Sequence, residues 1–403
     1  MNTHVKMTTR INQLDVMRGF ALLGILIMNI ISFGLPEAHY FNPHAEGVLH
    51  GWNQGALVVS ELFANEKFMG LFSLLFGASV VLFTDKVEGK GRSAWAFHMR
   101  RNGWLLVFGM LHAYLLWVGD ILVTYAICSV WLFFFRKWSA RNLFIASGAS
   151  VLLLLSMDAM MGWSVPHWTE ADVAEFGEFW TPSSAAIAQE VAAMRGTWVD
   201  QMTVRVPGAL ALQTEYLPML ALRATAMMLL GMGLYKAGVL NGSRGRRWNG
   251  GLALIGLTVG LAITGWGFHY SQTHEWAMEV FFDGGFFRSM GMVFLVLGYV
   301  GSILWLCGGE ARHGLERWLA PVGRMALTNY LAQTVICTTL MYGHGFGMFG
   351  TLGRVRLWLV ILPIWIVQII ASKWWMDRYA FGPVEWAWRS LTHWRIQPMK
   401  ARG

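Results

Sequence analysis

Long apolar stretches alternate with short polar connections along almost the whole chain. A transmembrane α-helix needs about 20 mostly apolar residues, and runs of roughly this kind can be counted ten times. The third and fourth runs are short and are separated only by Gly119 and Asp120, which predicts a tight helical hairpin. The pattern therefore predicts an all-α, polytopic membrane protein with ten transmembrane helices. These runs cover residues 19–35, 56–84, 103–118, 120–135, 143–162, 217–240, 251–270, 286–307, 322–341 and 355–376.

Composition supports the same class. Of the 403 residues, 55% are hydrophobic and 13% are charged, whereas about 25% are charged in an ordinary soluble protein. The net charge of +8 comes from short Lys and Arg clusters between apolar runs, which is typical of loops retained in the cytoplasm rather than of a nucleic-acid surface. We therefore expect the lipid bilayer as a partner and no nucleic acid.

The basic clusters lie in alternate connections, within 86–101, 136–141, 236–247 and 312–324. By the positive-inside rule, these connections and both termini are expected in the cytoplasm. The long connection 163–216 is then an outer loop, and its acidic residues fit that side. The chain is interpreted as one integral domain, 1–403, of the bacterial cytoplasmic (inner) membrane. Its parts are the N-terminal helices 1–162, the outer loop 163–216 and the C-terminal helices 217–403.

The third apolar run carries the first candidate site. His112 follows Arg101 by eleven residues and precedes Asp120 by eight. On a helix this puts His112 about 16 Å from Arg101 and on nearly the same face. An ionisable side chain near mid-membrane is costly and indicates function by default. A hydrogen bond to a neighbouring helix is the alternative role.

The first apolar run repeats this spacing. Asp15 and Arg18 are three residues apart and are expected to pair on one helical turn. Asn29 follows Arg18 by eleven residues, so that the two share a face. Arg18 could equally be a topology anchor, and Asn29 could simply bond to another helix.

Several segments, in this order, resemble the YeiB family of bacterial membrane proteins, and the resemblance covers nearly the whole chain. The segments are 14–19 (LDVMRG), 67–78 (KFMGLFSLLFGA), 119–122 (GDIL), 323–330 (GRMALTNY) and 382–389 (GPVEWAWR).

A more distant likeness concerns the first two helices. The opening Leu-Asp-x-x-Arg-Gly helix resembles that of the transmembrane acyltransferases, such as the lysosomal heparan-α-glucosaminide N-acetyltransferase and the bacterial sugar O-acyltransferases. The resemblance implies acyl-CoA used on the cytoplasmic side and an acceptor acylated on the other. Asn29 matches the amide of the glucosaminide enzymes. They also have a catalytic histidine in the first outer loop, near a Trp-Asn-Gly, and His50 before Trp52 is an imperfect match.

These observations lead to a first hypothesis, a membrane-bound acyltransferase in which His112 or His50 is the general base and Asp120 orients the ring. Acetyl-CoA or another acyl-CoA is the expected co-substrate, and the acceptor would be a hydroxyl or amine of a sugar, lipid or small molecule. Neither a tightly bound cofactor nor a metal is expected. The residues expected to bind acyl-CoA are Arg18, Arg100, Arg101 and Asn29, and those expected in the substrate pocket are Asp15, Asn329, Tyr330 and Gln333.

A second hypothesis is a transporter, or a lipid-binding or small-molecule-binding protein, without covalent chemistry. Buried polar groups on the first, third and ninth helices would then line a substrate path. A scaffold in a membrane complex is a third, and a homodimer is compatible with each. Binding of acyl-CoA would separate the first hypothesis from the other two.

Overall fold

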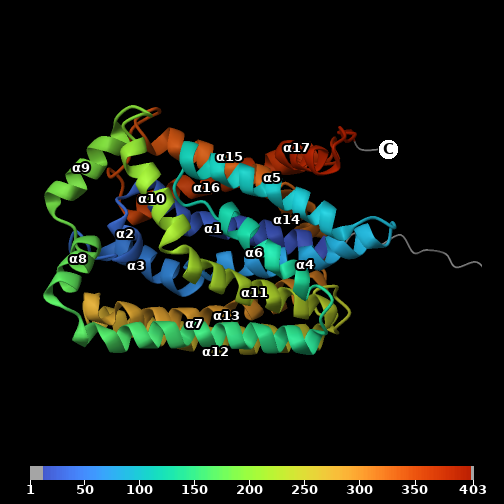
Figure 1. The fold of residues 1–403 in the computed structure, drawn as a ribbon, viewed down its shortest axis with the longest axis horizontal. Coiled ribbons are helices and arrows are strands. Elements are labelled where there is room, and N and C mark those ends of the chain that lie inside the picture. Colours follow the sequence, from blue (N-terminus) through green and yellow to red (C-terminus); the bar gives the residue numbers. More distant parts are fainter. Residues whose placement is uncertain (1–11, 401–403) are drawn as a thin grey trace, which may run out of the picture.

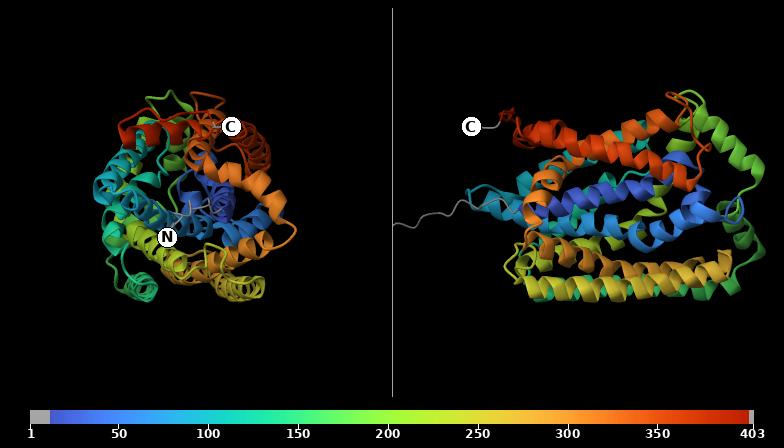
Figure 2. Two further views of the ribbon diagram at one scale, coloured as in Figure 1. Left: turned by 90° about the vertical axis from the view of Figure 1, so that its right-hand side faces the viewer. Right: turned by 180° about the vertical axis from the view of Figure 1, so that it is seen from behind.

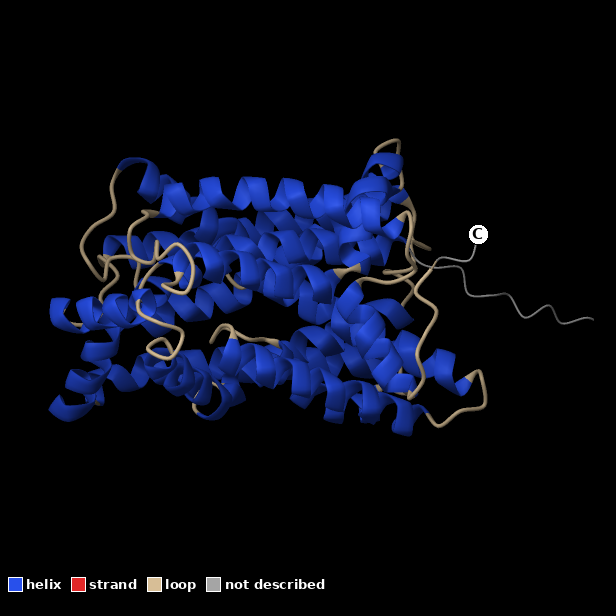
Figure 3. Cartoon of the chain, turned by 90° about the horizontal axis from the view of Figure 1, so that it is seen from above, coloured by secondary structure: helices blue, strands red, loops and turns tan. Residues whose placement is uncertain are grey.

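The structure is a computed structural model that describes residues 12–400. Its long helices run side by side along one axis (Figure 1). Most connecting loops lie toward the two ends of this bundle (Figure 3). In chain order the helices are α1 (Asn12–Gly34), α2 (Ala38–Phe41), α3 (Gly51–Val59), the π-helix η1 (Ser60–Ala64), α4 (Lys67–Glu88), α5 (Ala94–Leu115), α6 (Leu122–Phe135), α7 (Ala140–Ser164), the 3-10 helix η2 (Val165–His167), α8 (Glu170–Trp180), α9 (Ser184–Arg195), α10 (Met202–Thr214), α11 (Leu217–Lys236), α12 (Arg246–Thr273), the 3-10 helix η3 (Met278–Val280), α13 (Phe281–Cys307), α14 (Arg312–Arg324), α15 (Ala326–Met341), α16 (Arg354–Met376) and α17 (Pro383–His393).

Among the described residues, seven helical segments are long and apolar enough to cross a membrane. The expected all-α, polytopic membrane fold is therefore confirmed, whereas ten crossings remain a prediction. The other three expected helices, α5, α6 and α15, are present in the bundle, but α6 has only 14 residues and α15 only 16. The start of α1 and the whole of α17 lie at the same end of the bundle (Figure 2). The chain between them must therefore cross the bundle an even number of times, and ten crossings would meet this requirement. The segments counted as membrane-spanning are α1, α3 to α4, α7 with η2, α11, α12, η3 with α13, and α16.

We call the end that holds the start of α1 and α17 the basic end, and the opposite end the cap end. The segment predicted as an outer loop forms three helices, α8, α9 and α10, at the cap end (Figure 1). Local sequence explains where two of them begin: Thr169 and Asp172 form a capping box on α8, and the Ser183 hydroxyl accepts from Ala186 N on α9.

The centre of the bundle is α1, most of which is buried. It packs most extensively against α14, which ends within the motif 323–330 found in the sequence. Small residues permit this contact, because a Cβ atom on Gly19 would overlap Leu319 O, and one on Gly323 would overlap Asp15 O. The motifs at 14–19 and 323–330 therefore meet in space.

The three helices α8, α9 and α10, which we call the cap, are attached to the end of α5. Arg205 of α10 is buried and donates to Leu115 O at 3.0 Å and to Gln201 Oε1 at 2.9 Å. Trp198 Nε1 donates to the same Leu115 carbonyl at 3.1 Å. The last carbonyls of a helix have no intrahelical partner, so these bonds satisfy one of them and hold the cap over the end of α5.

Candidate functional site

His112 lies in the last turn of α5, and a sharp turn brings Asp120 back beside it. The His112 Nδ1 atom is 2.8 Å from Asp120 Oδ1, and both side chains are only 1% exposed. The other Asp120 oxygen accepts from Val123 N at 2.8 Å and so caps the start of α6. The helical hairpin predicted at Gly119 is therefore present, and it unites the histidine with the carboxylate.

The second ring nitrogen of His112 faces a hydroxyl group from another part of the chain. His112 Nε2 is 2.9 Å from Thr334 Oγ1 on α15. Because a carboxylate only accepts hydrogen bonds, Nδ1 carries the ring proton of a neutral His112. Nε2 can then accept from the Thr334 hydroxyl, whose other acceptor is Tyr330 O at 3.4 Å. Carboxylate, imidazole and hydroxyl follow one another as in a hydrolase triad, so Nε2 is the atom that can take up a proton.

Aromatic rings surround this histidine. The ring centroids of Tyr330 and Trp117 lie 5.0 and 6.1 Å from that of His112. Tyr330 OH donates to Gly119 O at 3.4 Å and so fixes the turn before Asp120. Trp117 Nε1 is buried and has no hydrogen-bond partner among the described residues, so a donor remains available beside His112.

Two other α15 residues expected in a substrate pocket face α16 instead. Gln333 Nε2 donates to Gln368 Oε1 at 2.9 Å. Asn329 Nδ2 donates to Ser372 Oγ at 2.9 Å, and Gln368 Nε2 returns a bond to Asn329 O at 2.8 Å. Of these α15 candidates, Tyr330 is the one placed beside His112, whereas Asn329 and Gln333 bond helix to helix.

Arg101 lines a pocket near the basic end, which we call the basic-end pocket. It has about 260 Å³ of space not filled by atoms, its open mouth included. The Arg101 guanidinium lies 4.7 Å from the Phe83 ring centroid and 4.5 Å from that of Trp388. The lining residues are Phe76, Ser79, Val80, His98, Arg101, Asn102, Leu105, Ser129 and Trp388.

The charge around this pocket is positive. Within residues 12–400 no carboxylate forms an ion pair with Arg101, and Arg18 and Arg389 are near enough to repel it. Arg18 Nη2 donates at 2.6 Å to the hydroxyl of Ser79, a lining residue, and Arg18 Nη1 forms the expected ion pair with Asp15 at 3.0 Å. This arrangement suits a ligand with several negative charges.

Four polar residues of the pocket were missed from the sequence: Ser79, His98, Asn102 and Ser129. His98 Nε2 lies 2.9 Å from Ser129 O, and Asn102 Nδ2 donates to Ala126 O at 2.6 Å. Both bonds lock α5 to α6. Asn102 Oδ1 is buried without a partner among the described residues. The signal was available, because positions 98, 102, 105, 109 and 112 follow helical spacing along one face.

The remaining candidates lie elsewhere. Arg100 donates to Ala96 O and covers the Phe97 ring, outside the lining. Asn29 is half-buried on α1, and His50 is exposed just before α3. Neither residue lines the basic-end pocket. No group of three His, Cys, Asp or Glu side chains suited to a metal is found within residues 12–400.

Comparison with known proteins places the chain in a family. Residues 234–395 match the family described as "Protein of unknown function (DUF418)". The chain is 33% identical to "Uncharacterized protein YeiB" of Escherichia coli (strain K12), over 94% of this chain and 95% of that protein. It is 30% identical to "Uncharacterized protein YxaH" of Bacillus subtilis (strain 168), over 97% and 96%. No solved structure matches the chain. At this identity and coverage, the chain belongs to the YeiB family.

Proposed function

We propose that the protein is an acyltransferase of the bacterial cytoplasmic membrane that moves an acyl group from acyl-CoA to an acceptor hydroxyl or amine. The observation that carries the proposal is the position of His112, with one ring nitrogen bonded to Asp120 and the other to a hydroxyl. In its neutral form, a histidine in this arrangement is oriented to accept a proton at Nε2.

The chemistry follows from that arrangement. The acceptor oxygen or nitrogen attacks the thioester carbonyl carbon while its proton passes to His112 Nε2. The carbon–sulfur bond then breaks, and the coenzyme A thiolate leaves and recovers the proton from the imidazolium. Asp120 stabilises the imidazolium while it exists. The Thr334 hydroxyl occupies the place that an acceptor hydroxyl would take.

The basic-end pocket supports the choice of donor. Coenzyme A carries several phosphate charges, and guanidinium groups bind phosphate in bidentate fashion. Arg101 faces this pocket, Arg18 adjoins it, and eleven residues of α5 separate Arg101 from His112, or about 16 Å. The flexible arm of coenzyme A would bridge these two places, with its phosphates at the cytoplasmic surface.

A specific observation also favours transport as a second candidate function. Charged side chains are buried among the cap-end halves of several helices, and the helical segment Gly51–Glu88 is interrupted there by η1 and by Glu66, whose φ is 65°. Interrupted helices and buried charges are typical of transporter substrate sites. Absence of any interaction with acetyl-CoA would favour this alternative.

The acyltransferase proposal is tested with His112→Gln. The purified full chain in liposomes is given labelled acetyl-CoA and washed bacterial membranes as the source of acceptor. Since glutamine fills the space but cannot take up a proton near neutral pH, transfer should fall by about 10²–10⁴-fold. The His50→Gln variant is the control and should keep its activity. Full activity in His112→Gln together with loss in His50→Gln would move the reaction to the first loop.

A further inference from the structure

Charged side chains gather near the cap end, on elements that carry none of the residues used in the proposed reaction. Glu66 lies between η1 and α4, and the others come from η1, α4, α7, α11 and α13. Placing so many ionisable groups within membrane-spanning helices is costly unless each is paired or used. The group consists of Glu61, Glu66, Lys67, Asp158, Arg223 and Arg288.

Most members of this group have a close hydrogen-bonding partner, inside or outside the group. Arg223 Nη1 lies 2.8 Å from Glu66 Oε1. Lys67 is fully buried, and its Nζ donates to Glu61 O at 2.6 Å. The Asn65 amide donates to both Glu61 carboxylate oxygens, at 2.9 and 3.0 Å.

Arg288 is the exception. Its nearest ion-pair contacts are 3.7 Å, from Nη1 to Glu61 Oε2 and from Nε to Glu66 Oε1. These distances are too long for hydrogen bonds. No hydrogen bond from its guanidinium to a described residue is found, and Nε is buried without a partner. The Arg288 guanidinium has five N–H donors, and these donors therefore remain available to a ligand.

The Arg288 side chain lines a second pocket, which we call the cap-end pocket. It has about 250 Å³ of space not filled by atoms, its open mouth included. Thr264 is 4% exposed, and its hydroxyl oxygen is buried without a partner among the described residues. A buried polar group left unbonded is unfavourable and calls for an explanation. The lining residues are Glu61, Thr264, Gly267, Phe268, Ser271, Trp276, Gly284 and Arg288.

We propose that the cap-end pocket binds a singly charged oxyanion group, a carboxylate or a phosphate ester, of a small solute or of a lipid head group. Arg288 would donate two parallel N–H bonds to the oxyanion, and the Thr264 hydroxyl would donate to it as well. Glu61 also lines the pocket and repels a second negative charge, so a multiply charged ligand is disfavoured. This site goes beyond the proposed acyl transfer and shares no residue with it.

Binding is measured on the purified full chain in detergent by thermal unfolding. One arm compares sodium acetate and sodium dihydrogen phosphate with sodium chloride at equal ionic strength. The other compares short-chain phosphatidylglycerol with short-chain diacylglycerol, which lacks the phosphate. A specific shift in the first arm alone identifies a free solute, and a shift in the second alone identifies a lipid head group. No shift beyond that of chloride or diacylglycerol in either arm would overturn the proposal.

Two variants tie the shift to the pocket. Arg288→Gln should weaken binding at least 10-fold, since hydrogen bonds to charged groups are the stronger ones. Thr264→Val removes one donor and should weaken binding about fivefold, while the unfolding temperature without ligand stays the same or rises, because an unbonded hydroxyl has been removed. This second variant tests the site even if Arg288→Gln does not fold.

The control is Arg312→Gln, which changes an exposed arginine paired with Glu316 at 2.9 Å and should bind like the unmodified chain. Equal ligand shifts in all three variants would contradict the assignment. An acetyl-CoA shift that persists in Arg288→Gln would show that this site is independent of the one proposed for acyl-CoA, so the two proposals can fail separately.

Discussion

The two pockets each expose an arginine, but their surroundings differ in charge. At the basic end, the Arg101 guanidinium lies between two aromatic rings, and Arg18 and Arg389 are near it. Within the described residues, no carboxylate forms an ion pair with Arg101. At the cap end, Arg288 lies 3.7 Å from each of two carboxylates. The surrounding charge, rather than the arginine itself, decides which ligand fits. The basic-end pocket suits the several phosphates of a nucleotide cofactor, and the cap-end pocket suits a single oxyanion.

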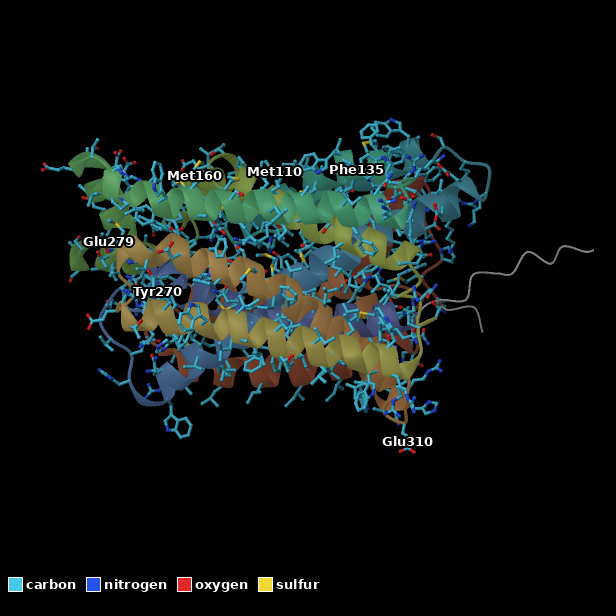
Figure 4. The ribbon with its side chains drawn as sticks, turned by 90° about the horizontal axis from the view of Figure 1, so that it is seen from below. Met110, Phe135, Met160, Tyr270, Glu279 and Glu310 are labelled. Atoms are coloured by element: carbon cyan, nitrogen blue, oxygen red, sulfur yellow. The ribbon has the colours of Figure 1, made fainter. Side chains whose placement is uncertain are left out.

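Figure 4 labels Tyr270 near the end of α12 and Glu279 in η3, just before α13, both at the cap end. His112 belongs to neither pocket: it is in the last turn of α5, whereas Arg101 lies eleven residues earlier. In the proposed reaction, the acyl group of a coenzyme A molecule bound at the basic end must therefore reach along α5 to His112.

The largest effect is expected from Asp120→Asn. The asparagine Oδ1 atom would accept from Val123 N, as the carboxylate does now, and would leave the NH₂ group facing His112 Nδ1. The ring would then carry its proton on Nε2, the wrong nitrogen for a base. Acyl transfer should fall by about 10⁴-fold, as in an asparagine-substituted triad.

Thr334→Val is the matched control for that change. It removes the partner of the other ring nitrogen and leaves the base competent, so transfer should fall much less than in Asp120→Asn. Comparable losses in the two variants, with equal loss of thermal stability, would instead make the cluster a structural link between α5 and α15.

The second prediction concerns the cap-end ion pair between Arg223 and Glu66. Arg223→Gln removes the partner that the buried Glu66 carboxylate has at 2.8 Å and leaves it only the longer contact with Arg288 at 3.7 Å, which costs up to about 3–5 kcal/mol of stability. Arg312→Gln, in an exposed pair, should cost no more than about 1 kcal/mol. Thermal unfolding of both variants measures the difference, and similar losses would show that the Glu66–Arg223 pair is not a structural element.

The third prediction concerns the attachment of the cap. Burial raises the pKa of Glu190 from 4.5 to about 7, even though the Glu37 N–H bonds to its carboxylate at 3.0 Å. Folded Glu190 thus keeps its proton between pH 4.5 and 7 while a released Glu190 loses it. Attachment should therefore weaken as the pH rises through this window, by up to about 3 kcal/mol.

Hydrogen exchange of α9 as a function of pH measures this effect. In Glu190→Gln the side chain no longer titrates, so protection of α9 should stay constant across the window. A pH dependence that survives unchanged in this variant would assign it to another group.

Local patterns predicted much of this fold. The apolar runs correspond to helices, and the Gly119 turn suggested that His112 and Asp120 could meet. Contacts between distant parts of the chain could not be predicted in this way. Thr334 is 222 positions from His112, and the bond from Trp388 Nε1 to Arg101 O joins residues 287 apart. Such pairs depend on how helices pack, which a hydrophobic period does not specify.

The charged group near the cap end shows the same limit more sharply. Glu66 and Lys67 are neighbours in the sequence, yet the structure pairs Glu66 with Arg223 of α11 and turns Lys67 toward the Glu61 carbonyl. The left-handed backbone at Glu66, with φ of 65°, directs this choice. A non-glycine residue in that conformation is uncommon and is not evident from local sequence.

The central claim is that acyl-CoA binds at the basic-end pocket, and calorimetric titration of acetyl-CoA into the purified chain tests it most directly. Binding should be measurable in the unmodified chain, weaker by about 10- to 100-fold in Arg101→Gln, and unchanged in Arg100→Gln, whose side chain lies outside the lining. No binding to the unmodified chain, or equal binding to all three proteins, would contradict the claim.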